Sequence, residues 1–334
     1  MVQVLITIDT ECSMGGAWED PSLNPIDPER AVLGRINSHY HGIPLLMDIL
    51  EKYELPGVFF IEVFAGLNGF FQELASAYSR IVQRGHDAQL HLHPIHLHYR
   101  QARDKQINPT ELPAAKDMIG AFPLQTQVEM LRRGILLFRD MLGRAPLAFR
   151  AGNFGASMST LDALERVGIR FDSSFNAAYL NGDCQLDSGG AINRSWKHND
   201  LWEIPITVFQ TGVWGHKSWK QLNINAVSLW EMISVLEQAE RIGLTTVTFI
   251  AHSFSLFKIG DMQFRRLRPD RLVQKRFEGL CRFLHNNSDR FRVVKVPQLE
   301  PPSLAESETD FPQMGAIIPA VRKGIQAINR MNWF

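Results

Sequence analysis

The fold is decided by the segment Gly85-His86-Asp87-Ala88-Gln89-Leu90-His91-Leu92-His93-Pro94, which alternates apolar and polar residues and then meets a proline. Such alternation predicts a strand, in which side chains two apart point to the same face. We therefore expect His91 and His93 to project together from the end of this strand. Pro94 is expected to stop the strand, and His96 and His98 to follow in a loop. Two imidazoles presented in this way suit a divalent transition metal, most simply zinc. The alternative is a surface cluster of histidines with no role.

Strand and helix patterns alternate about seven times along the chain, which predicts an α/β architecture with parallel strands. Outside the histidine segment, strands are expected at 2–8, 58–61, 146–149, 169–172, 202–208, 244–251 and 291–296. Pro205 lies within the strand at 202–208, which predicts an edge strand there. Helices are expected to open at 42–44 and to cover roughly 71–84, 125–142, 157–167, 226–242 and 270–284. Residues 99–122 are polar and irregular, which is typical of an insertion over one rim. The sequence has no P-loop, no dinucleotide-binding glycine motif and no internal repeat.

Composition narrows the class of protein. Apolar residues make up 45% and charged residues 21% of the 334 residues, as in an ordinary globular protein. The formal net charge is zero, so the basic excess that marks nucleic-acid binding is missing. The sequence contains no apolar run of the roughly 18 residues that a membrane span needs.

The chain is expected to divide into one barrel domain, residues 1–300, and a linker with a helical tail, residues 301–334. Pro301 and Pro302 open the linker, and residues 316–334 follow a basic amphipathic pattern. Such a tail is expected to pack on the barrel or on a second subunit. In the second case the protein would be a homo-oligomer. Peripheral membrane contact is the alternative.

The N-terminal residues and the cysteines predict a cytoplasmic location. Residues 2–9 have the pattern of a strand and lack the basic start and cleavage site of a signal peptide. Cys12, Cys184 and Cys281 are scattered and odd in number, which favours a reducing compartment without disulfides.

Besides the histidine strand, three of the predicted strands end at titratable residues. Asp9 and Glu11 follow the first strand, Arg150 follows the strand at 146–149, and His252 follows the strand at 244–251. In a parallel barrel the carboxyl ends of the strands gather on one face, which is where such folds hold their sites. We therefore expect these residues to lie near His91 and His93.

Together these residues suggest metal-assisted hydrolysis of an amide or ester. Glu11 with His91 and His93 would make a site of two imidazoles and one carboxylate, which leaves a coordination position for water. Asp9 would then take a proton from that water, with Arg150 keeping it ionised and oriented. The duller alternatives are that Glu11 is a solvated loop acid, Asp9 a cap and Arg150 a structural ion-pair partner.

Two further groups complete this hypothesis. His252 would give a proton to the leaving amine as general acid. The alternative is that it is a core histidine whose ring nitrogens bind only other groups of the protein. The turn Ala151-Gly152-Asn153 would contribute backbone N–H groups to an oxyanion site, with Asn153 lying against the substrate.

Five short motifs in order resemble the polysaccharide deacetylases of carbohydrate esterase family 4, the NodB-homology type, over roughly residues 2–298. They are Val4 to Glu11, Gly85 to His91, Phe149-Arg150-Ala151-Gly152-Asn153-Phe154-Gly155, Trp202-Glu203-Ile204-Pro205 and Phe249-Ile250-Ala251-His252. The resemblance implies a distorted parallel (β/α)7 barrel, a zinc-type metal and removal of N-acyl groups from sugars. It also implies Asp9 as base, Arg150 as its partner and His252 as acid.

The chain departs from the family pattern at three positions. Glu11 stands where the family usually has Asp, Ile95 where it has a second metal-binding His, and Gly152 where it has Pro. His93 is the expected replacement for that second His, and His96 is the alternative.

The leading hypothesis is a metal-dependent sugar N-deacylase, for acetyl or formyl groups, that acts on a saccharide in surface-glycan or polysaccharide biosynthesis. A carbohydrate-binding relative without catalysis is the first alternative. An amidohydrolase that acts on a non-sugar amide is the second.

Overall fold

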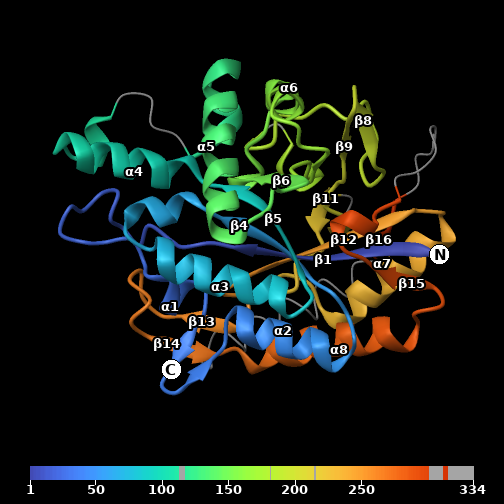
Figure 1. Cartoon of the computed structure of the whole chain (residues 1–334). Coiled ribbons are helices and arrows are strands. Elements are labelled where there is room, and N and C mark those ends of the chain that lie inside the picture. The colour runs from blue at the N-terminus through green and yellow to red at the C-terminus, as the bar shows by residue number, and fades with distance from the viewer. Residues whose placement is uncertain (113–116, 181, 214–215, 301–310, 315–334) are drawn as a thin grey trace.

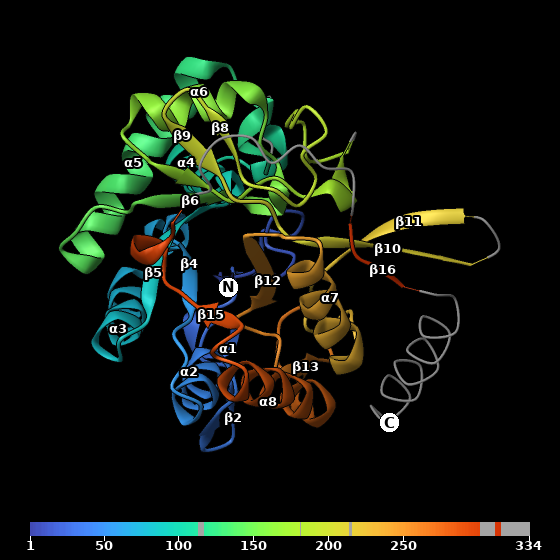
Figure 2. The same ribbon diagram turned by 90° about the vertical axis from the view of Figure 1, so that its right-hand side faces the viewer.

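The computed structural model of the chain describes residues 1–112, 117–180, 182–213, 216–300 and 311–314. One parallel sheet, curled into an incomplete barrel, runs through the middle of the molecule, with helices on its outside (Figures 1 and 2). None of the described helices is long and apolar enough to cross a membrane.

The sheet has nine strands, of which seven follow one another in parallel. In spatial order these are β12 (Thr246–His252), β1 (Val2–Thr10), β4 (Val58–Glu62), β5 (Asp87–Leu92), β6 (Ala148–Ala151), β7 (Phe171–Asp172) and β9 (Leu201–Glu203). The other two are β8 (Trp196–His198), antiparallel to β9, and β15 (Phe291–Val293), which pairs with the start of β1. This arrangement confirms the predicted distorted (β/α)7 barrel.

The helices form the outer layer because each has one apolar stripe that packs on the sheet. They are α1 (Pro28–Ala31), α2 (Ile43–Lys52), α3 (Phe71–Gln83), α4 (Pro94–Lys105), α5 (Leu124–Leu142), α6 (Met158–Arg166), α7 (Leu229–Arg241) and α8 (Arg271–Asn286). Gly85 follows α3 with a φ of 85°, the left-handed conformation in which a helix end favours glycine. The six helices predicted from apolar spacing are thereby confirmed.

The barrel does not close through a ladder between β9 and β12. The segments that contain Thr207 and Leu222 lie beside β12 in this gap instead. The Thr207 N–H donates to the Thr248 carbonyl oxygen at 3.3 Å, and the Ile250 N–H donates to the Leu222 carbonyl oxygen at 2.9 Å. These bonds keep the backbone groups of β12 satisfied where it has no neighbouring strand in the sheet.

The core lies on both sides of β1, whose nine residues are all buried. Leu, Val, Ile and Phe side chains make up most of it, which explains why the barrel strands could be recognised from sequence as near-continuous apolar runs. The smaller β-elements lie at the rims: β2 (Arg35–Ile36) with β3 (His39–Tyr40), β13 (Phe257–Ile259) with β14 (Leu267–Pro269), and β10 (Val208–Val213) with β11 (His216–Gln221) and β16 (Gln313–Met314).

Two sequence predictions were wrong. The strand expected at 202–208 is interrupted, because β9 ends at Glu203 and Val208 already belongs to β10. Pro205 lies between them and lacks the N–H that a continuous ladder needs. His96 and His98 were expected in a loop, but they lie in α4. Pro94 ends the strand and at the same time opens this helix, since a proline costs nothing in a helix's first turn.

The predicted C-terminal linker and helical tail fall mainly on residues 301–310 and 315–334, which lie outside the described residues. The expectation that the tail packs on the barrel or on a second subunit, or contacts a membrane, therefore stays a prediction.

Candidate active site

A cavity of about 220 Å³ opens at the carboxyl ends of the parallel strands. Six of the seven predicted site residues line it, and the seventh, Arg150, lies directly behind Asp9. The lining residues are Asp9, Glu11, His91, His93, Ala151, Asn153, Phe154, Tyr179, Asp183, Gln221, Asn223 and His252. The structure thus brings together side chains that are up to about 240 residues apart in the chain.

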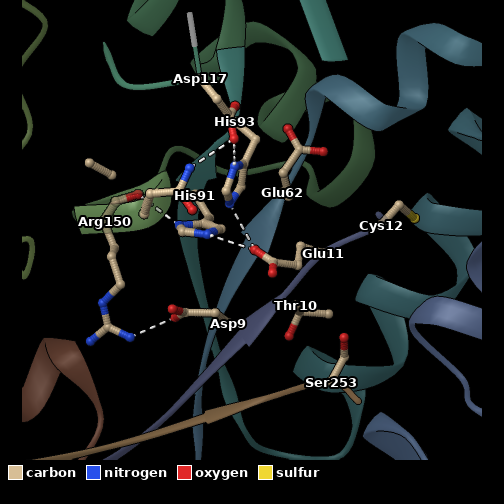
Figure 3. A network of polar contacts seen from close by, with 12 residues as sticks. Asp9, Thr10, Glu11, Cys12, Glu62, His91, His93, Asp117, Arg150 and Ser253 are labelled. Atoms are coloured by element: carbon tan, nitrogen blue, oxygen red, sulfur yellow. Dashed lines mark hydrogen bonds and ion pairs between the residues drawn. The ribbon is translucent and has the colours of Figure 1, made fainter. Parts of the chain in front are cut away.

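Glu11, His91 and His93 form a polar cluster in this cavity (Figure 3). Glu11 Oε2 lies 3.2 Å from His91 Nε2 and 2.9 Å from His93 Nε2. His91 is the second-last residue of β5, and His93 follows the strand, so the two rings come from one backbone segment and meet edge to face at 5.0 Å. Glu11 reaches them from the residue after β1.

The other ring nitrogen of each histidine fixes its tautomer. His91 Nδ1 donates to the Arg150 carbonyl oxygen at 2.8 Å, and His93 Nδ1 donates to Asp117 Oδ2 at 2.8 Å. In the neutral imidazole the proton sits on one nitrogen only, so each Nε2 then carries a lone pair. Two imidazole lone pairs and a carboxylate oxygen of Glu11 therefore converge, an arrangement that only a cation satisfies.

The pKa shifts of Glu11 and His93 also indicate a place for a cation. Burial alone would raise the pKa of Glu11, but the neighbouring His93 and His91 outweigh it and hold this pKa well below its ordinary value. Burial likewise opposes protonation of His93, but the carboxylates of Asp117 and Glu11 raise the pKa of His93 well above its ordinary value. The site thus favours a positive charge between these groups, either a proton or a metal ion.

The donor set fits a divalent transition metal. Two imidazole nitrogens and one carboxylate oxygen are the ligands of many catalytic zinc sites, and each imidazole has the second partner that such ligands usually have. Glu11, His91 and His93 are the residues that would hold the ion. The geometry does not choose between zinc and another metal of similar preference.

Arg150 and Asp9 form a buried ion pair beside this cluster (Figure 3). The Arg150 guanidinium donates to Asp9 Oδ1 at 2.6 Å and to Thr7 Oγ1 at 2.9 Å. It also donates to the carbonyl and hydroxyl oxygens of Ser173, each at 3.0 Å, and lies 4.1 Å above the ring centre of Phe60. With so many partners the fully buried Arg150 has one orientation, and this orientation fixes one oxygen of Asp9.

His252 approaches the cavity from the strand next to β1. Its backbone is in register with Asp9, so both side chains stand at the same height of the barrel. The ring stacks on Phe254 at a centroid distance of 4.9 Å, and the His252 N–H donates to Ser255 Oγ at 2.8 Å. His252 is partly exposed in the cavity, so its ring can meet a substrate rather than only the core.

Asn153 lies in a sharp turn at the mouth of the cavity. Asn153 and Phe154 have φ values of 55° and 56°, a left-handed conformation that costs energy, above all for the aromatic residue. The Asn153 side chain donates to Asp117 Oδ2 at 2.9 Å. Asn153 therefore lines the cavity as expected, but its amide is already bound to an acid that the sequence analysis missed.

That missed acid is Asp117, which binds His93, Asn153 and the Ile95 N–H. It belongs to the polar segment 99–122, which showed no motif. Asp117 is 24 residues away from His93 in the chain, so neither strand nor helix periodicity connects the two. Only the need of a metal-binding imidazole for a second partner could have indicated that such an acid exists.

His96, the alternative metal ligand, faces another way. Its Nε2 donates to the Cys12 carbonyl oxygen at 2.9 Å, and its side chain is buried in α4. It is absent from the cluster of Glu11, His91 and His93 among the described residues. The alternative is wrong because helix α4 turns His96 away from the strand end.

Comparisons with known proteins find a likeness only at the level of structure. No protein-family model matches the chain, and no curated protein matches it. A protein from Mycobacterium smegmatis assigned as a polysaccharide deacetylase matches with a TM-score of 0.55 and 16% identity, over 92% of this chain and 95% of the other.

Two more solved structures match with a TM-score of 0.50 and 12% identity. One is assigned as a polysaccharide deacetylase of Pseudomonas aeruginosa, with 88% of each chain covered. The other is Puue allantoinase, with 89% of this chain and 88% of the other covered. The chain therefore has the fold of the polysaccharide deacetylases, as the resemblance of its motifs to carbohydrate esterase family 4 implied.

Proposed function

We propose that the protein is a metal-dependent hydrolase that removes an N-acyl group, acetyl or formyl, from a sugar. The observation that carries the proposal is the convergence of three ligand atoms, from Glu11, His91 and His93, beside the Asp9–Arg150 ion pair in one cavity. The fold, which is shared with polysaccharide deacetylases, supports the choice of an N-acyl sugar.

In the proposed reaction, Asp9 accepts a proton from the attacking water. Arg150 gives Asp9 one defined orientation, because its guanidinium donates to Asp9 Oδ1. When bound, the metal would lower the pKa of water and polarise the acyl carbonyl. The ion pair with Arg150 offsets the cost of burying the Asp9 carboxylate, since a buried carboxylate without a partner would be costly.

His252 completes the proposed reaction from the strand next to that of Asp9. It donates a proton to the amine as the carbon–nitrogen bond breaks, and it stands level with Asp9 on the neighbouring strand. Within the turn at 151–153, the Ala151 N–H already donates to Ser174 Oγ at 2.9 Å, so the N–H groups of Gly152 and Asn153 would bind the developing oxyanion. The rings of Phe154 and Tyr179, 5.4 Å apart at the cavity wall, offer an apolar surface to a sugar ring.

We further propose that the reaction belongs to surface-glycan or polysaccharide biosynthesis and takes place in the cytoplasm. The cysteines support the location: Cys12, Cys184 and Cys281 are all buried and unpaired, which fits a reducing compartment.

A screen for released acylate tests the function. The full chain, purified without a histidine tag and loaded with zinc or cobalt, is incubated with N-acetyl and N-formyl sugars, free, nucleotide-linked and lipid-linked. Acetate or formate should appear, and a chelator should stop its release. A metal-loaded protein that releases acylate from none of these sugars would refute the sugar deacylase.

A second candidate is an amidohydrolase that acts on a non-sugar amide. The fold that the chain shares with Puue allantoinase favours it, because the same residues suit hydrolysis of a ring amide. Including cyclic ureides and lactams in the screen separates the two functions. Activity on those compounds together with inactivity on sugars would favour the second.

A further inference from the structure

Asp117 holds three groups at the edge of the proposed metal site. Its Oδ2 accepts from His93 Nδ1 at 2.8 Å and from Asn153 Nδ2 at 2.9 Å, and its Oδ1 accepts from the Ile95 N–H at 3.1 Å. The side chain is only 26% exposed. Both oxygens thus have defined partners, and the carboxylate has one orientation relative to the His93 ring (Figure 3).

His93 Nε2 faces Glu11, and the hydrogen bond from His93 Nδ1 to Asp117 decides that this Nε2 carries a lone pair. An imidazole binds a metal through Nε2 only when the proton sits on Nδ1, and an acceptor fixed at Nδ1 selects that tautomer. His91 obtains the same selection from the Arg150 carbonyl oxygen, which belongs to the barrel sheet. His93 lies outside the sheet and depends on an acid from a separate segment.

The His93 ring also has a seat that excludes other positions. A Cβ atom on Gly152 would lie 2.7 Å from His93 Cε1 and Nδ1, closer than any packing allows. The ring therefore occupies the space that a side chain at position 152 would fill. On another side it meets the edge of the His91 ring at 5.0 Å. These contacts keep the plane of the ring in place, and the hydrogen bond to Asp117 fixes which edge of the ring faces Glu11.

We propose that Asp117 is the positioning residue that makes His93 a metal ligand, with Gly152 providing the space and Asn153 clamping the acid. The inference rests on the proposed function only through the metal site. It also links two departures from the family pattern. Where Ile95 replaces the usual histidine, the imidazole comes from position 93, and a proline at 152 would overlap with that imidazole.

A purely structural role for Asp117 makes a different prediction. Oδ1 accepts the Ile95 N–H in the first turn of α4, so Asp117 also caps that helix. Asp117→Asn separates the roles. The amide oxygen can still accept from Ile95, but the amide nitrogen would meet the N–H of His93 donor to donor.

The test is the metal affinity of the metal-free full chain, measured by zinc competition with a chromophoric chelator. Asp117→Asn should bind zinc about 10- to 100-fold more weakly than wild type, the usual effect of losing such a partner. The cobalt-loaded variant should also show a changed visible absorption, because one nitrogen ligand is lost. If Asp117 served only as a cap, the variant would keep the wild-type zinc affinity, absorption and melting temperature, because its amide oxygen still accepts from the Ile95 N–H.

Asp162→Asn is the matched control, because Asp162 accepts from His198 Nε2 at 2.8 Å outside the cavity. It should leave zinc affinity unchanged. Asn153→Ala keeps the carboxylate and removes one clamp, so it should weaken zinc binding about threefold to tenfold, the value of one hydrogen bond. It also replaces Asp117→Asn if that variant does not fold.

Equal zinc affinity of wild type, Asp117→Asn and Asn153→Ala would overturn the inference and leave the proposed function intact. A zinc-loaded wild type that hydrolyses no amide, with the affinities in the expected order, would instead refute the function and support the role of Asp117.

Discussion

Two groups of three side chains in the described part of the chain have the residue types and spacing that metals bind, but their lone pairs are arranged differently. The groups are Glu11, His91 and His93 in the cavity, and Asp162, Glu165 and His198 between α6 and the β8–β9 hairpin. In the cavity group, acceptor oxygens bind the outer Nδ1–H of both rings, and the inner nitrogens converge on a carboxylate oxygen of Glu11.

In the second group the carboxylates already have N–H donors. Both oxygens of Glu165 accept, from Asn199 Nδ2 at 2.9 Å and from the Asp200 N–H at 2.8 Å. Asp162 accepts from His198 Nε2 at 2.8 Å. These bonds tie the hairpin turn to α6. The comparison teaches that residue type and spacing do not define a metal site, whereas lone pairs that lack a donor do.

The largest expected effect is a difference in metal content between variants of the two groups. Wild type should carry about one divalent metal ion per chain, and His91→Ala should carry none, because two remaining ligands hold such an ion weakly. His198→Ala should keep the full metal content. Metal analysis by mass spectrometry, on protein purified without a histidine tag, decides this. Metal loss in His198→Ala as well as in His91→Ala would mean that the comparison is wrong.

Asp9→Asn should show that an acid in the same cavity can be essential without binding the metal. Asp9 is held by Arg150 and is proposed to carry the proton, so the amide should lower kcat about 10²- to 10⁴-fold. Metal content should stay at the wild-type level. Steady-state kinetics with an N-acyl sugar that the enzyme accepts, together with metal analysis, test both statements. A loss of metal in Asp9→Asn would assign Asp9 to the ligands instead.

Much of the cavity group could be predicted because it depends on short-range patterns and one topological rule. His91 and His93 were placed by alternation, and Asp9, Arg150 and His252 by their positions at strand ends. Parallel strands bring these ends together whatever their separation in the sequence. The alternation of strand and helix patterns predicted an α/β fold with parallel strands, and the resemblance to the polysaccharide deacetylases implied the barrel.

The remainder depends on contacts that no local pattern encodes. Asp117 reaches His93 from an irregular segment, and Gly152 matters through one interatomic distance. The break after Glu203 was missed because Pro205 was read as an edge-strand residue rather than as the end of pairing. His96 was misplaced because the sequence pattern did not reveal that Pro94 starts a helix.

Gly152→Ala sharpens the comparison by disturbing the cavity group through packing alone. Gly152 is not among the glycines with a left-handed backbone, so the added methyl group acts only by its contact with His93. We expect zinc affinity to fall about tenfold, and the free energy of unfolding to fall by about 1–3 kcal/mol, as in other overpacked sites. Gly182→Ala, whose Cβ would lie 3.4 Å from its nearest neighbour, should change neither. Unchanged zinc affinity in Gly152→Ala would show that the His93 ring moves without cost.

The smallest effect concerns a third way to satisfy carboxylates, a shared proton. Glu203 and Asp172 are both fully buried at neighbouring positions of β9 and β7. Burial and the proximity of Asp172 raise the pKa of Glu203 well above its ordinary value, and burial raises the pKa of Asp172. The pair therefore keeps a proton in the native protein at pH values at which the unfolded chain has lost it.

It follows that the free energy of unfolding of wild type should fall as the pH rises above about 4.5, the ordinary pKa of Glu, by at most about 1.4 kcal/mol per pH unit. Glu203→Gln cannot ionise, and its amide oxygen can still accept from the Phe175 N–H. The variant should have a flatter pH dependence and be more stable than wild type at pH 8, by about 1 kcal/mol. Urea unfolding between pH 5 and pH 8 measures both slopes. Parallel slopes would show that no proton is shared, and the two buried carboxylates would then need a cation.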